Sequence, residues 1–200
     1  MSNTYHHGDL RRALLVAAEA ELAEKGTERF TLRACAKRAG VSHAAPAHHF
    51  GDVEGLLSAL AADGFRRFAE MASERLQACA DASPPKRLNV LGVGYVDFAR
   101  ANPALFKLMF ASDIPDFDDK ELRSAAEASF SQLAAAVGDA TGTDPLASHD
   151  GQLRVATMWS MVHGLSHLIL ARRMRFLNER DETELQADIA AIISAVALVR

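Results

Sequence analysis

Apolar residues recur every three or four positions along almost the whole chain, and glycines, prolines or capping residues separate the runs. This spacing places an apolar stripe on one face of an α-helix. Aromatic residues make up only 6% of the chain, and runs rich in valine, isoleucine and threonine are absent. Because such a composition favours helix over sheet, the sequence predicts an all-α fold of about nine helices.

The first fifty residues predict three short helices with tight connections. Gly26 stands where a glycine can take a positive φ and end the first helix. Thr31 is a good cap for the second helix, and Ser42 for a third from about His43 to His49. Between them lies the turn Gly40-Val41-Ser42. A connection this short is what a helix-turn-helix requires.

The remaining residues predict a bundle of six longer helices. Asp52 caps the first of them, proline follows Ser83 and Asn102 at the starts of the next two, and Asp118 with Glu121 forms a capping-box pattern. Two long helices, at about 152–176 and 183–199, finish the chain. We therefore divide the chain into an N-terminal helix-turn-helix domain, 1–52, and a helical C-terminal domain, 53–200.

The predicted helix-turn-helix has an unusual local charge, although the net charge of the chain is −4. From Phe30 to Gly51 there is no aspartate or glutamate. The cationic or titratable residues in this stretch are Arg33, Lys37, Arg38, His43, His48 and His49. A protein that binds the phosphates of a nucleic acid, and so releases their counterions, needs a cationic stretch of this kind without carboxylates. A solvated face that happens to be basic is the alternative.

The sequence offers little support for secretion, a membrane span or disulfides. The N-terminus lacks the apolar segment of a signal peptide, and the longest uncharged stretch, 155–171, is shorter than the ~20 apolar residues of a membrane helix. Cys35 and Cys79 are the only cysteines, and we expect both to be small core residues in a reducing compartment. These features predict a cytoplasmic protein with no membrane partner.

No motif of a known catalytic class is present. The sequence contains no Walker loop, no G-x-S-x-G, no H-E-x-x-H and no C-x-x-C, and Gly92-Val93-Gly94 follows no strand. We therefore expect neither enzyme activity nor a cofactor. The alternative to a nucleic-acid-binding protein is a helical ligand-binding or catalytic bundle without a DNA function. Such a protein would have no reason to keep residues 30–51 free of carboxylates.

Two segments of the chain resemble the TetR family of transcriptional regulators. The stretch from Leu10 to Leu60 is similar to its DNA-binding domain, most specifically from Thr31 through His49-Phe50 and in Glu54-Gly55-Leu56. Trp159-Ser-Met-Val-His163-Gly164 resembles the WHG-type C-terminal domain of one branch of the family. The resemblance implies a homodimeric repressor that binds a palindromic operator in double-stranded DNA and that an unknown small-molecule effector releases. It further implies that the C-terminal domain binds this effector and that the last two helices pair across the dimer, unless the helix from 183 only completes the core of each monomer.

The resemblance also implies which residues contact DNA. His43, Ala44 and Ala45 occupy positions that face base edges. The expected phosphate contacts are the helix starts at Thr31 and Ser42, together with His49, Arg33 and the arm Tyr5-His6-His7; Ala47 and His48 complete the candidate set. Ala47 stands where the family usually has a tyrosine, and Val53 where it usually has a lysine. Pro46 replaces a usual leucine, so we expect the short helix to begin as a 3₁₀-like turn.

Bulky residues on several C-terminal helices are candidates for an effector pocket. They are Phe68, Tyr95, Phe98, Phe106, Phe110, Trp159, His163 and His167. Plain core packing is the alternative for each of them. His163 and His167 are one helical turn apart, a spacing that can contact a polar effector, hold a metal ion with help from Asp97 or His149, or serve structure alone. We predict no metal site.

Overall fold

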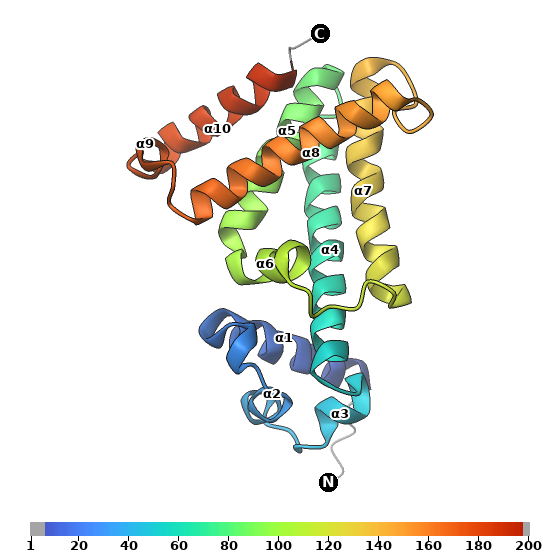
Figure 1. Ribbon diagram of the computed structural model, residues 1–200, viewed down its shortest axis with the longest axis vertical. Helices are drawn as coiled ribbons and strands as arrows, with labels where there is room; N and C mark the ends of the chain where they lie inside the picture. Colours follow the sequence, from blue (N-terminus) through green and yellow to red (C-terminus); the bar gives the residue numbers. More distant parts are fainter. Residues whose placement is uncertain (1–6, 198–200) are drawn as a thin grey trace. The chain divides into compact units, whose positions relative to one another are not determined.

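The computed structural model describes residues 7–197, and these form ten α-helices and one 3₁₀ turn, with no strand among them (Figure 1). The elements are α1 His7–Lys25, η1 Thr27–Arg29, α2 Leu32–Ala39, α3 Ala45–Phe50, α4 Val53–Ala78, α5 Pro84–Ala101, α6 Pro103–Ala111, α7 Lys120–Thr141, α8 His149–Leu170, α9 Arg175–Asn178 and α10 Glu182–Ala197. The prediction of an all-α fold is confirmed for these residues. The arm Tyr5-His6-His7 begins outside the described residues. None of the described helices is long and apolar enough to cross a membrane.

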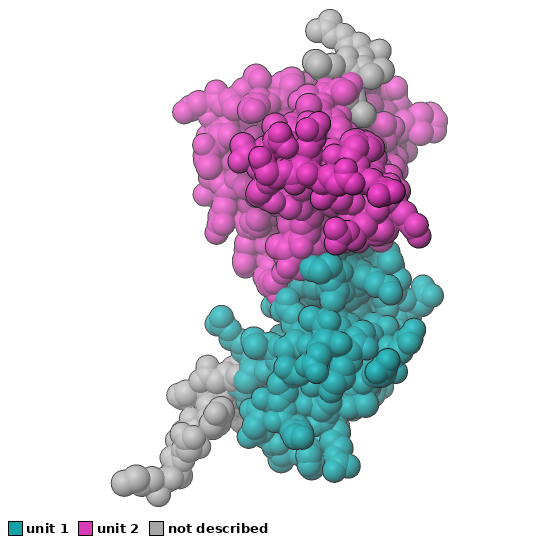
Figure 2. Space-filling model, turned by 90° about the vertical axis from the view of Figure 1, so that its left-hand side faces the viewer, with its two compact units in different colours: residues 1–65, 103–126 teal, residues 66–102, 127–200 magenta. Residues whose placement is uncertain are grey.

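The chain divides into two compact units, each built from separated segments (Figure 2). The first comprises residues 1–65 and 103–126, and the second residues 66–102 and 127–200. Besides the three N-terminal helices, the first unit thus contains α6 and the first parts of α4 and α7. Helices α4 and α7 each contribute residues to both units.

The core of the first unit forms where α1 packs against α2 and α6. Leu14, Cys35 and Leu56 are completely buried there, which confirms that Cys35 is a core residue. Helix α6 also lies close to α4, because a Cβ placed on Gly64 would be 2.7 Å from the Met109 sulfur. The buried Ser58 hydroxyl accepts a hydrogen bond from the Asp116 N–H at 2.8 Å and so fixes the segment that follows α6.

The core of the second unit forms where α5 packs against α8 and α10. Ile189 and Ile193 of α10 are completely buried, and the Asn89 amide donates to the Ala190 carbonyl at 2.9 Å and to the Ser194 hydroxyl at 2.8 Å. The apolar stripe of α10 is therefore used within its own chain. This packing agrees with the alternative that the last helix completes the core of the monomer.

Two helix boundaries differ from the sequence prediction. The helix expected over 152–176 ends at Leu170, because Arg172 adopts a left-handed conformation with φ 55° and the short α9 follows. The left-handed residue that ends a helix is usually glycine, so an arginine at this position gives no signal in the sequence that the helix ends here. This break accounts for ten helices instead of about nine. At the start of α7, Asp119 rather than Asp118 is the cap, since its carboxylate accepts from the Leu122 N–H at 2.9 Å.

An ion pair between α5 and the start of α10 should make stability depend on acid pH. Both carboxylate oxygens of Glu182 accept from Arg100, at 2.9 and 2.7 Å, and these bonds lower the pKa of Glu182 to about 2. Because the ordinary value is 4.5, the stabilisation is complete above that pH and is lost as the pH falls toward about 2. We expect the unfolding free energy of Glu182→Gln, measured with urea, to fall less steeply than that of the wild type in this range. Parallel curves would contradict the assignment.

Candidate nucleic-acid interface

Helix α2 begins at a cap that the sequence correctly indicates. Thr31 has extended backbone angles, and its hydroxyl accepts a hydrogen bond from the Ala34 N–H at 3.2 Å. The other N–H groups of this first turn have no partner within the helix. Thr31 is exposed, so the start of α2 can hold a phosphate.

The turn between α2 and α3 requires glycine at position 40. Gly40 has φ 69° and ψ 31°, a left-handed conformation that other residues adopt at a cost. The N–H of Val41 returns to the Ala36 carbonyl at 3.0 Å, which closes the end of α2. Ala36 is completely buried where the helices meet. The predicted helix-turn-helix connection is thus present.

Helix α3 begins two residues later than predicted, and Ser42 is not its cap. The N-cap position belongs to Ala44, and no side chain caps the helix. The Ser42 carbonyl instead accepts from the Ala45 N–H at 3.0 Å, a tight turn like the one that Pro46 predicted. Since proline has no N–H, it fits in the first helical turn, where the N–H groups lack helical partners anyway.

The candidate base-reading residues form an exposed surface at the start of α3. His43, Ala44, Ala47 and His48 are exposed, whereas Ala45 and His49 are half-buried. Pro46 is buried and fixes the helix to the unit. Histidine and alanine side chains are the groups that α3 offers outward.

The stretch from Phe30 to Gly51, which has no aspartate or glutamate, carries less free positive charge than the sequence indicates. Arg38 donates to Glu21 at 3.0 Å and also bonds to Glu24, both of which lie on α1. Hydrogen bonds from Lys25 and Arg38 hold the pKa of the buried Glu21 carboxyl below its ordinary value. Arg38 is therefore neutralised within the fold. Arg33 and Lys37 are exposed on α2, and no ion pair is found for either among the described residues.

The end of α3 packs closely against the start of α4. Asp52 caps α4 as predicted, because its carboxylate accepts from the Gly55 N–H at 2.9 Å. A Cβ on Gly55 would lie 2.0 Å from the Phe50 carbonyl oxygen, so only glycine fits there. The Arg11 guanidinium lies 5.4 Å from the centre of the Phe50 ring and pairs with Glu121 at 2.8 Å. These contacts fix the orientation of α3.

The predicted effector residues separate into two clusters. In the first unit, the ring centre of Phe110 lies 5.0 Å from that of Phe106 and 5.2 Å from that of Phe65. The other six candidates belong to the second unit: Phe68, Tyr95, Phe98, Trp159, His163 and His167. None of the eight lines the cavity described below between α4, α5 and α7, or the basin beside it.

The cluster in the second unit has a polar centre. The Tyr95 hydroxyl lies 2.8 Å from Nδ1 of His163 and accepts from the Trp159 indole N–H at 3.4 Å. Phe68 contacts Tyr95 edge to face at 5.4 Å. Burial raises the pKa of the Tyr95 hydroxyl, and burial together with the charge of His167 lowers the pKa of His163. Both groups therefore favour their neutral forms.

Asp97, considered above as a third metal ligand beside His163 and His167, already has other partners. That carboxylate accepts from Arg75 and from Gln186, both at 2.7 Å. The side chains that the structure describes, those of residues 10–195, include no group of three or more histidine, cysteine, aspartate or glutamate residues placed to hold a metal ion.

Two models of known protein families match this chain, each over a different segment. The profile described as "Bacterial regulatory proteins, tetR family" matches residues 14–60. The profile described as "Tetracyclin repressor-like, C-terminal domain" matches residues 88–191, more than half of the chain. The chain belongs to the TetR family.

Individual proteins and solved structures are also similar to this chain. The HTH-type transcriptional regulator BetI from Serratia proteamaculans is 36% identical over 101 residues, which are 50% of this chain and 51% of that protein. The chain thus spans about half the length of the curated relatives it matches. A protein with unknown function from Rhodococcus sp. RHA1 has a similar structure, with a TM-score of 0.78 and 28% identity over 97% of this chain and 98% of that one. The fatty acid degradation regulator FadR from Bacillus halodurans shares the fold alone, with a TM-score of 0.70 and 13% identity over 94% and 98% of the two chains.

Proposed function

We propose that this TetR-family protein is a DNA-binding transcriptional regulator, acting in the cytoplasm as a repressor that a small molecule releases. The observation that carries the proposal is the α2–α3 pair, in which the left-handed Gly40 turn and the exposed outer side of α3 form a helix-turn-helix. Family membership supports it, because this is a family of regulators rather than of enzymes. We accordingly propose no catalytic activity.

In the proposed complex, α3 lies in the major groove. His43 approaches a base edge through its ring nitrogens, while Ala44 and Ala45 offer only apolar contact to a thymine methyl group. The proposed phosphate contacts on either side come from Arg33, His48, His49, the start of α2 at Thr31, and Ser42 in the turn before α3. With alanine at position 47 and valine at position 53, two phosphate contacts of the family pattern are missing, and the proposed affinity depends more on the N-terminal arm.

The proposed homodimer forms through the outward face of α8. Leu153, Thr157, Ser160, Gly164 and Leu168 follow one another at helical spacing on this face. Leu153 is 52% exposed and Leu168 is 42% exposed, whereas the opposite face of α8 is buried. A two-fold dimer would place two recognition helices roughly 34–36 Å apart, or a multiple of that distance. Each would read one half of a palindromic site.

For the effector we propose the Tyr95 cluster of the second unit. Its polar groups come from Tyr95, Trp159 and His163. Phe68 packs against both Tyr95 and Phe98, and this combination of polar and aromatic groups suits a ligand with one polar end. The effector lowers DNA affinity only by its preference for the conformation that does not bind, typically by about 1–3 kcal/mol.

The experiment that tests DNA binding uses the contrast between two arginines. Duplex DNA from the region flanking the gene is titrated with the protein at several salt concentrations. Arg33→Gln should lower the slope of log K against log salt by about 1, because one phosphate contact is lost. Arg38→Gln should leave the slope unchanged, because Glu21 and Glu24 already neutralise Arg38.

Two results would contradict the proposal. If the wild type ignores duplex DNA even at low salt, the regulatory function fails. If it binds, but no molecule that binds the Tyr95 cluster changes the affinity for DNA, release by an effector fails while DNA binding stands.

A further inference from the structure

A second candidate binding site lies in the second unit, away from the Tyr95 cluster. It is a cavity of about 240 Å³ between α4, α5 and α7. At about 30 Å³ for each water, it has room for roughly eight water-sized atoms. Leu76, Pro84 and Ala136 give it apolar walls, and its polar residues include Ser73, Arg87, Gln132 and Asp139.

Two buried polar atoms beside this cavity have no hydrogen-bond partner among the described residues. The Gln132 amide nitrogen donates to the Ala69 carbonyl at 3.1 Å and to the Ser73 hydroxyl at 3.0 Å, but its Oε1 accepts from no group. The Nε of Arg87 donates to none. Native structures rarely leave such atoms unpaired, because each carries a desolvation cost. Both atoms have almost no accessible surface, so a ligand can bind this donor and this acceptor only after the two side chains turn toward the cavity.

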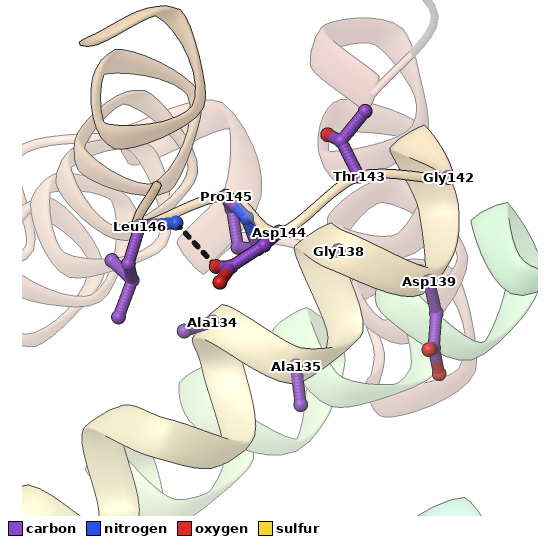
Figure 3. Close-up of a pocket in the computed structure, with 9 residues that line it drawn as sticks. All are labelled: Ala134, Ala135, Gly138, Asp139, Gly142, Thr143, Asp144, Pro145 and Leu146. Carbon is purple, nitrogen blue, oxygen red and sulfur yellow. Dashed lines mark hydrogen bonds between the residues drawn. The ribbon is translucent and has the colours of Figure 1, made fainter. Parts of the chain in front are cut away.

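The cavity has one positive and one negative side chain, Arg87 and Asp139, and the ion pair between them is long. Arg87 reaches Asp139 at 3.4 Å, longer than a charge-assisted bond of about 2.7–2.9 Å. The side chains are 32% and 55% exposed, so both can turn toward a ligand. Figure 3 shows Asp139 pointing away from Asp144 of the loop that follows α7. Asp139 and Ala135 also border the open basin of about 600 Å³ drawn there, which adjoins the cavity.

We propose that this cavity binds a small zwitterion with one carboxylate and one ammonium group, of the aliphatic amino-acid type. The carboxylate accepts from Nε of Arg87, and the ammonium group donates to Oε1 of Gln132 and to Asp139. The alkyl part packs against Leu76, Pro84 and Ala136. A ligand with only one of the two charged groups leaves either Arg87 or Gln132 unpaired. The site does not depend on the proposed DNA binding.

The test measures binding to the full chain by calorimetry with three probes of similar shape. L-valine carries both groups, isovalerate only the carboxylate and isobutylamine only the amine. We expect L-valine to bind at least about tenfold more tightly than either analogue, since each charged hydrogen bond contributes about 1.5–3 kcal/mol, or roughly 10–150-fold. Arg87→Met and Gln132→Met should each weaken L-valine binding about tenfold. The control Lys86→Met removes an exposed neighbouring cation that does not line the cavity and should bind L-valine as the wild type does.

Three outcomes would overturn the proposal: no saturable binding of L-valine, equal binding of all three probes, or undiminished binding by both methionine variants. If a variant does not fold, the comparison of the three probes on the wild type still tests the proposal.

Titration of the same samples with DNA tests the proposed regulatory function independently of L-valine binding. Loss of DNA binding with intact L-valine binding would refute only the proposed regulatory function.

Discussion

Replacing Gly55 by alanine should destabilise the first unit and remove tight DNA binding. A Cβ at this position would lie 2.0 Å from the carbonyl oxygen of Phe50 and 3.2 Å from its carbonyl carbon. Both are backbone atoms of the last residue of α3, so no side-chain rotation relieves the overlap. Overpacking of this kind costs about 1–3 kcal/mol, and we expect Gly55→Ala at the upper end of the range.

The loss of DNA affinity should exceed what the loss of stability explains. To accept the new methyl group, the end of α3 must move away from α4, and the exposed residues of α3 move with it. Thermal unfolding and DNA titration at a temperature where the variant is folded separate the two effects. Glu54→Ala is the matched control, because Glu54 is exposed on the first turn of α4 and its loss costs only about 0.3–1 kcal/mol of helix-dipole interaction. If folded Gly55→Ala binds DNA as well as this control, the close contact does not position α3.

Local signals explain why so much of the helix-turn-helix was predictable. Thr31, Gly40 and Asp52 each act within three or four residues of their own position, through one capping bond or one backbone conformation. Such signals do not depend on the rest of the fold. The all-α class followed in the same way, from periodicity that each helix carries by itself.

The errors arose where the outcome depends on a second segment. Arg38 counted as a free cation in the sequence, but Glu21 and Glu24 on α1 neutralise it, and only the packing of α1 against α2 shows this. Ser42 has the right residue type for a cap, but Pro46 shifts the start of α3 by two residues. Arg172 ends α8 in a conformation that its residue type does not indicate.

The candidate effector residues show the same limit. Eight bulky residues share one sequence pattern, but Phe106 and Phe110 pack in the first unit and the other six belong to the second. Periodicity indicates that a residue faces a core, but not which core. The hydrogen bonds that join Tyr95 to Trp159 and His163 cross from α5 to α8, and only the packing of these helices shows them.

The largest effect that we expect on assembly comes from the outward face of α8. Since α10 buries Ile189 and Ile193 in its own chain, we place the dimer contact on α8, which exposes Leu153 and Leu168. Leu153 and Leu168 lie on either side of Gly164, where an added Cβ would meet no atom within 4 Å. A glycine with open space above it lets a second helix approach closely, and the leucines on both sides then bury their side chains.

The double variant Leu153→Glu/Leu168→Glu should therefore be a folded monomer. Both side chains are exposed, at 52% and 42%, so glutamate costs the isolated chain little, but in a two-fold dimer it places carboxylates in an apolar contact. Sedimentation should show half the mass of the wild type. Affinity for a palindromic site should fall by about 10²–10⁴, because the two half-sites are no longer bound by one linked pair of domains. Val16→Glu, at a 62% exposed valine of α1, is the control and should remain dimeric. A double variant that sediments as the wild type does would exclude this face as the dimer contact.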